Sequence, residues 1–184
     1  MPKIQLDKEI DINKVLEFAT KKHQGQKRDD GSEYIEHPIR VAKIVEKYKP
    51  NSLNKNILIA GALLHDTLED TYTSYKELVD NFGEVVASLV VELTTAKYGC
   101  KMIGKAIYLA EKMQYMTNYA LYIKLADRLD NISDLKGCSE NKKAKMIADT
   151  KYFLEYLDKK RNLTKSQMEI KNEIQTKLNS LCKQ

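Results

Sequence analysis

Residues 60–71, AGALLHDTLEDT, join a strongly apolar helix to a cluster of polar side chains. The preceding residues predict one helix over 54–68 that is apolar around most of its circumference, which is typical of the central helix of a bundle. This helix ends in four polar groups: His65, Asp66, Glu69 and Asp70. Such groups at the end of a core helix cost desolvation energy unless they bind something. The stretch therefore predicts a helical core with a polar site at its edge.

Helical periodicity extends over most of the chain, whereas alternating, strand-like segments are short. Further helices are predicted over residues 12–23, from Pro38 onward, and over 74–82, 85–93, 104–115, 117–135, 139–160 and 164–182. Two glycines within residues 95–104 predict a loop. At 184 residues the chain has the length of one ordinary domain. We therefore expect an all-α fold, a single-domain helical bundle over 1–184.

Composition and charge argue against a membrane protein, a nucleic-acid binder and a secreted protein. Hydrophobic residues make up 42% and charged residues 31%, and no apolar run approaches the roughly 18 residues that a membrane span needs. The net charge of +5 comes from lysines that are spread along the chain and mixed with acids, which does not favour a nucleic-acid partner. The N-terminus lacks the apolar core of a secretory signal. Cys100, Cys138 and Cys182 form no CxxC pair, so a reducing, cytoplasmic location is expected. The oligomeric state is not indicated.

Two of the three histidines adjoin other candidate metal ligands. The pair His65-Asp66 supplies a neutral nitrogen and an anionic oxygen at neighbouring positions, a mixture that suits divalent transition metals. Two ligands rarely make a stable site, and His37 and Asp127 are the best further candidates by context. We therefore expect a metal site formed by His37, His65, Asp66 and Asp127.

Acidic residues near these ligands fit hydrolytic chemistry. Asp127, Asp130, Asn131 and Asp134 fall on one face of a predicted helix, although such a stripe is by itself typical of a solvated surface. Glu69 and Asp70 follow the His-Asp pair by about one turn. A metal would lower the pKa of a water molecule, and Glu69 and Asp70 are placed to take its proton or to hold it in line for attack.

Four stretches together carry a family resemblance. They are ATKKHQGQKRDDGSEYIEHPIRVA (19–42), AGALLHDTLEDT (60–71), NFGEVVASLV (81–90) and IKLADRLDNISDL (123–135). With them the chain resembles the HD hydrolase domain of the RelA/SpoT family, especially its small stand-alone alarmone hydrolases. The resemblance covers about residues 11–160, which leaves 161–184 as a C-terminal buttressing helix.

The resemblance implies a fold, a metal and a reaction. It implies a helical bundle of the HD phosphohydrolase type, manganese bound by His37, His65, Asp66 and Asp127, and hydrolysis of ppGpp to GDP and pyrophosphate. Glu69 and Asp70 match the catalytic acid pair of the family. The matching substrate contacts are Arg28 on the nucleotide and Asn131 beside the metal, and Tyr34 and Lys124 are expected to add to the substrate pocket.

Four positions depart from the family pattern and add negative charge: Asp29, Glu33, Asp130 and Asp134. Nearby acids weaken the binding of a highly charged anion unless cations offset them. Two alternatives therefore stay open beside ppGpp hydrolysis. One is an HD phosphohydrolase that acts on another nucleotide, such as ppApp or NADPH, and the other is a non-catalytic nucleotide sensor.

Overall fold

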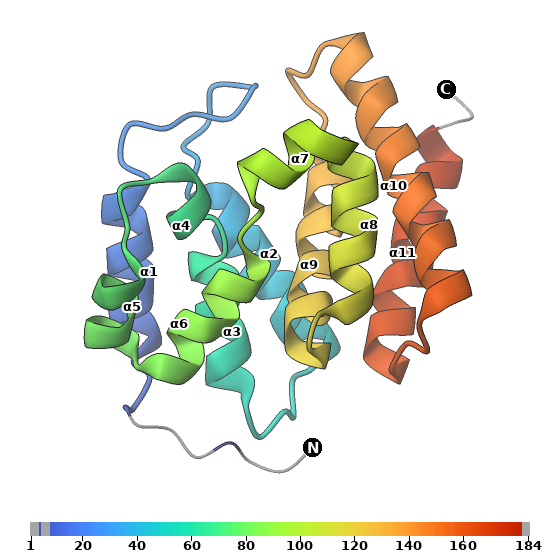
Figure 1. Ribbon diagram of the computed structural model, residues 1–184. Helices are drawn as coiled ribbons and strands as arrows, with labels where there is room; N and C mark the ends of the chain where they lie inside the picture. Colours follow the sequence, from blue (N-terminus) through green and yellow to red (C-terminus); the bar gives the residue numbers. More distant parts are fainter. Residues whose placement is uncertain (1–3, 5–7, 182–184) are drawn as a thin grey trace. The chain divides into compact units, whose positions relative to one another are not determined.

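The structure is a computed structural model that describes residue 4 and residues 8–181 (Figure 1). Within these residues it contains eleven helices and no strand, with one isolated bridge between Lys27 and Glu33. The all-α prediction is therefore confirmed. The fold divides into two compact units, and each is described by itself. Unit 1 comprises the described residues up to Arg28 and Ser32–Thr94, and unit 2 comprises Asp29–Gly31 and the described residues from Thr95 onward. The prediction of a single domain stays a prediction.

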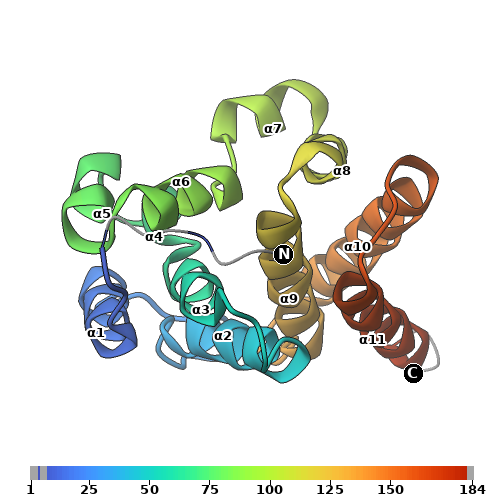
Figure 2. The ribbon, with the colours of Figure 1, turned by 90° about the horizontal axis from the view of Figure 1, so that it is seen from below.

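Unit 1 is built around one buried helix. Its helices are α1 (Ile12–Lys22), α2 (Glu36–Tyr48), α3 (Lys55–Leu64), α4 (Thr67–Asp70), α5 (Tyr75–Phe82) and α6 (Glu84–Leu93). All of α3 from Ile57 to Leu64 is buried. It packs against α1, α2 and α6, and Figure 2 shows α2 running beside it. The residue pattern of α3, apolar on every side, matches this central position.

Unit 2 contains the helices α7 (Lys97–Ile103), α8 (Lys105–Tyr115), α9 (Asn118–Ser133), α10 (Glu140–Lys160) and α11 (Lys165–Leu181). Helix α9 packs against α10 and α11, and α8 packs against α7 and α10 (Figure 1). Helix α11 buries Ile170, Ile174 and Leu178 and covers α9. The last residues of the predicted buttressing segment, 182–184, lie outside the described residues.

The predicted helix over 54–68 is wrong in one respect, because the chain breaks after Leu64. His65 Nδ1 lies 2.8 Å from the carbonyl oxygen of Ala62, and Thr67 Oγ1 donates to that of Leu64 at 2.7 Å. These side chains occupy carbonyls near the helix end, where backbone acceptors lack intrahelical partners. A separate turn, α4, then begins with Asp66 at its N-cap. His65 and Asp66 therefore lie in the turn between α3 and α4.

Two smaller expectations also need correction. Within the predicted loop 95–104, residues Lys97–Ile103 form a helix, α7. Gly99 lies inside it because a Cβ there would meet the ring of Tyr108 at 2.5 Å, whereas Gly104 has a φ of +88° and ends it. Helix α2 starts at Glu36, two residues before the predicted Pro38. A proline is tolerated there because the first helical N–H groups have no intrahelical acceptor.

Among the described residues, no helix combines the length and apolar character that spanning a bilayer requires. Cys100 and Cys138 form no disulfide, and Cys182 lies outside the described part.

Candidate active site

His65 lies at the C-cap of α3 with its ring completely buried in unit 1. Its Nδ1 is 2.8 Å from the carbonyl oxygen of Ala62. Because a carbonyl only accepts, Nδ1 carries the proton and Nε2 carries the lone pair. The backbone thus fixes the tautomer in which Nε2 is free to accept a proton or bind a metal, as the partner of a ligand histidine commonly does.

His37 approaches His65 from the first turn of α2. Its backbone N–H donates to the carbonyl of Tyr34 at 3.0 Å, and its side chain is 1% exposed. The two imidazole rings are 5.1 Å apart at an angle of 68°, and each offers a ring nitrogen within 4.8 Å of the other. Two buried imidazoles from different helices therefore face the same point.

Asp66 supplies an anionic oxygen at that point. Its Oδ2 lies 3.1 Å from Nε2 of His65 and 3.7 Å from Nε2 of His37, and it accepts a 2.6 Å hydrogen bond from the Tyr34 hydroxyl. Lone-pair nitrogens and a carboxylate oxygen repel one another unless a cation or proton lies among them. The mixed nitrogen and oxygen donor set, largely buried, fits a divalent transition metal.

Glu69 and Asp70 both lie on the single turn of α4 that follows Asp66. Glu69 is half-buried and Asp70 is exposed. The backbone N–H groups of both residues bond to the Asp66 carbonyl, at 3.2 Å and 2.9 Å. In addition, Nε2 of Gln26 donates to the Asp70 carbonyl at 2.7 Å. The acid pair is therefore tied through its backbone to Asp66, whose carboxylate lies beside the two histidines.

Three predicted site residues come together on α9 of unit 2. Asp127 is 5% exposed, and its Oδ2 lies 3.0 Å from Nζ of the buried Lys124. Its Oδ1 accepts a hydrogen bond from Nδ2 of Asn131. Asp130 is also buried, at 4% exposure, so the interpretation of this stripe as a solvated surface is wrong for Asp127 and Asp130. A buried carboxylate is a candidate ligand for a cation, because a charge inside the protein needs compensating partners.

The remaining predicted substrate residues lie in the segment between α1 and α2. Arg28 is half-buried, and its backbone N–H bonds to the Ser32 carbonyl at 2.9 Å. Tyr34 is also half-buried, and its hydroxyl contacts Asp66. Tyr34 therefore has a contact within the protein that the sequence did not predict.

Two of the four acidic departures from the family pattern are ion-paired. Asp29 pairs with Lys142 at 2.5 Å and also accepts from Sγ of Cys138 at 2.9 Å. Glu33 pairs with Lys27. Since both carboxylates have a cationic partner, their effective charge is smaller than the sequence suggests.

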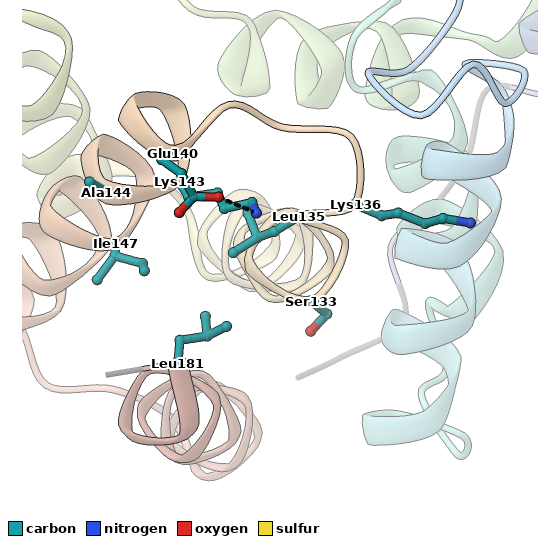
Figure 3. Close-up of a pocket in the computed structure, with 8 residues that line it drawn as sticks. All are labelled: Ser133, Leu135, Lys136, Glu140, Lys143, Ala144, Ile147 and Leu181. Carbon is teal, nitrogen blue, oxygen red and sulfur yellow. Dashed lines mark hydrogen bonds and ion pairs between the residues drawn. The ribbon is translucent and has the colours of Figure 1, made fainter. Parts of the chain in front are cut away.

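Unit 2 also contains a cavity of about 580 Å³. Its lining residues are Ser133, Leu135, Lys136, Glu140, Lys143, Ala144, Ile147 and Leu181. Figure 3 shows the side chains of Leu135, Ile147 and Leu181 around one space, with the Lys143–Glu140 ion pair beside it and Lys136 pointing away. None of the predicted site residues lines this cavity.

Comparison with known proteins identifies the family of the chain. The HD-domain family model matches residues 15–152. A guanosine-3′,5′-bis(diphosphate) 3′-pyrophosphohydrolase of Aquifex aeolicus is 39% identical over 76% of this chain, which spans only 20% of that protein. The MESH1 proteins of Xenopus tropicalis and Homo sapiens, which carry the same enzyme name, are 37% and 38% identical; the alignments cover 70% and 67% of this chain and 71% and 68% of theirs.

Solved structures share the fold. A metazoan ortholog of SpoT, described as hydrolysing ppGpp, superposes with a TM-score of 0.79 over 96% of this chain and 98% of its own, at 24% identity. A Listeria monocytogenes protein gives a TM-score of 0.65 over 80% of this chain and 99% of its own, at 20% identity. The fold and the His-Asp site define an HD-domain protein. The chain belongs to the HD-domain family, within the group that contains the guanosine-3′,5′-bis(diphosphate) 3′-pyrophosphohydrolases.

Proposed function

We propose that this protein is a metal-dependent phosphohydrolase that removes the 3′-pyrophosphate of ppGpp, giving GDP and pyrophosphate. The observation that carries this proposal is the convergence of His37, His65 and Asp66 on one buried point in unit 1, next to an acid pair. The substrate assignment is supported by the enzyme name of the MESH1 relatives, of which the chain covers about two thirds or more.

The proposed metal ligands are His37, His65, Asp66 and Asp127, and the proposed metal is Mn²⁺. Two imidazoles and two carboxylates suit this ion, although they also accept other divalent transition metals. The burial of Asp127 supports its own assignment, since Asn131 and Lys124 hold its carboxylate inside the protein. When bound, the cation would polarise the phosphorus centre and lower the pKa of a water molecule.

In the proposed reaction, one acid of the pair Glu69 and Asp70 takes a proton from the attacking water, and the other holds this water in line for attack. The water oxygen forms a bond to the phosphorus attached to O3′, the P–O3′ bond breaks, and O3′ takes up a proton. Such general base catalysis contributes about 10²–10⁴-fold to the rate. The backbone bonds from α4 to Asp66 support this assignment, because they restrict where the two acids can lie.

The proposed substrate contacts are Arg28, Tyr34, Lys124 and Asn131. A guanidinium can stack on a purine and also bind phosphate, which suits Arg28. Two of the acidic departures are ion-paired, which supports the binding of an anionic nucleotide. We further propose a cytoplasmic protein whose partner is a small nucleotide rather than a nucleic acid.

The test is release of pyrophosphate from ppGpp by the purified protein with Mn²⁺, beside ppApp and NADPH. We expect turnover of ppGpp that His65→Ala and Asp66→Asn abolish. Turnover of only another nucleotide would show that the acidic departures change the substrate. Binding of ppGpp without turnover would instead favour the nucleotide sensor.

A further inference from the structure

His23 is the one histidine that the proposed metal site does not use. It caps the C-terminus of α1, where its backbone N–H bonds to the Ala19 carbonyl at 3.0 Å. Its side chain is 2% exposed, and its buried Nε2 has no hydrogen-bond partner among the described residues. A buried imidazole with one unused nitrogen costs desolvation energy, so its position needs a reason beyond the capping of a helix.

The ring of His23 supports Tyr34. The two rings are stacked, with centroids 4.8 Å apart and an angle of 28° between their planes. Tyr34 in turn donates its hydroxyl to Oδ2 of Asp66 at 2.6 Å. Stacking on a buried ring restricts the orientation of the phenol, and thereby the direction from which Asp66 accepts its hydrogen bond.

The other edge of His23 contacts Gln26. Nδ1 lies 2.8 Å from Oε1 of Gln26, and Nε2 of the same amide donates to the Asp70 carbonyl at 2.7 Å. Because that carbonyl only accepts, it fixes the orientation of the amide, so Oε1 faces His23 and Nδ1 carries the proton. His23 is therefore a donor that holds the amide in the orientation Asp70 requires.

We propose that His23 is a positioning residue of the hydrolytic site, which orients the metal ligand Asp66 through Tyr34 and the catalytic Asp70 through Gln26. This inference rests on the proposed function, since Asp66 and Asp70 have those roles only in a hydrolase. It assigns two separable effects to one side chain. The stacked face acts on metal affinity, and the Nδ1–H acts on turnover.

A pair of substitutions separates the two effects. His23→Asn keeps a donor near Nδ1 but removes the ring, so the Kd for Mn²⁺ should rise about tenfold, the size usual for lost support of a metal ligand. His23→Phe keeps a ring against Tyr34 but removes the donor. In this variant kcat for ppGpp should fall about tenfold while KM and the Mn²⁺ Kd stay within about twofold, as expected when a catalytic group is misplaced.

Titration of the metal-free protein with Mn²⁺ and steady-state kinetics at saturating Mn²⁺ give the two readouts, and thermal unfolding reports on folding. Lower melting temperatures with an unchanged Kd and kcat would make His23 a core residue only and overturn the proposal. If neither variant folds, Tyr34→Phe and Gln26→Met test the two paths separately, because both side chains are only half-buried. Unchanged Kd in the first and unchanged kcat in the second would equally overturn it.

Tyr115→Phe and Gln24→Met are matched controls, since both residues are exposed and lie outside the proposed site. A wild-type protein that hydrolyses no ppGpp would contradict the proposed function, yet the Mn²⁺ Kd of His23→Asn would still test the path through Tyr34. Conversely, active wild-type protein with unaffected variants would overturn the role of His23 alone.

Discussion

The hydroxyl of Tyr34 donates a 2.6 Å hydrogen bond to Oδ2 of Asp66. The sequence predicts Tyr34 in the substrate pocket, and this contact would also make it an outer partner of Asp66, a proposed metal ligand. Substitution of a residue that hydrogen-bonds to a metal ligand commonly weakens metal binding about 10–100-fold. Tyr34 can therefore have two roles that the sequence does not distinguish: contact with the substrate and orientation of Asp66.

Tyr34→Phe should therefore weaken Mn²⁺ binding about tenfold, and KM for ppGpp is measured beside it at saturating Mn²⁺. The two constants come from metal titration and initial rates. A variant with normal Mn²⁺ affinity and a raised KM would show that Tyr34 acts on the nucleotide, as the sequence predicted.

Lys124→Met should destabilise the metal-free protein. The ammonium is 3.0 Å from the carboxylate of the buried Asp127, and breaking a buried ion pair typically costs about 3–5 kcal/mol. Urea unfolding with and without Mn²⁺ measures this cost. If Asp127 binds the metal, added Mn²⁺ should compensate part of the lost charge and reduce the difference from wild type. An equal difference under both conditions would argue against Asp127 as a ligand.

Loss of Lys142 should matter more to the substrate than loss of Asp29. Asp29→Asn removes a negative charge that is already ion-paired, whereas Lys142→Ala leaves that charge next to Arg28 without its partner cation. The pair is partly exposed and worth up to about 1 kcal/mol, so Lys142→Ala should raise KM for ppGpp by at most about fivefold at low salt. High salt should remove the effect. A larger rise in Asp29→Asn would contradict this account.

Glu69→Gln and Asp70→Asn test the catalytic acids apart from the metal. The variant that lacks the general base should have a kcat about 10²–10⁴-fold below that of the wild type. The Kd for Mn²⁺ should stay within about threefold in both variants. Single-turnover rates and metal titration on the same preparations provide the comparison. Full turnover in both variants would contradict the assignment of Glu69 and Asp70 as general base, without contradicting the proposed metal site.

The stability of the metal-free protein should fall on mild acidification. Burial lowers the pKa of His23 below its ordinary value of 6.5. The unfolded chain therefore binds an extra proton as the pH drops through that value, and the stabilisation present above it is lost. Urea unfolding at about pH 7.5 and about pH 5.5 should show a smaller decrease for His23→Phe than for wild type. Equal decreases would show that His23 does not contribute.

Much of the fold follows from helical periodicity, because α1, α5, α6 and α8–α11 begin and end close to the predicted residues. The errors arise where side chains compete with the backbone. Nothing in the sequence near His65 breaks a helix by propensity, yet His65 and Thr67 occupy carbonyls and end α3. Gly99 resembles a loop residue, but the helix needs it for the close approach of Tyr108.

The site was predictable to the extent that its ligands are neighbours in sequence or match a motif. His65-Asp66 and Glu69-Asp70 are of this kind, and the structure brings His37 to the same point. The contacts of Tyr34 with Asp66 and of Gln26 with Asp70 span 32 and 44 residues. No periodicity encodes such contacts, since they depend on how α1, α2 and α3 pack. The role of His23 is therefore visible only in three dimensions.

The most direct test of the central claim is a ³¹P NMR time course of ppGpp with the wild-type protein, with and without Mn²⁺. We predict that, only with the metal, the resonances of the 3′-diphosphate are replaced by that of inorganic pyrophosphate while the 5′-diphosphate stays intact. Release of single phosphates, loss of the 5′-diphosphate, or an unchanged spectrum in the presence of Mn²⁺ would contradict it.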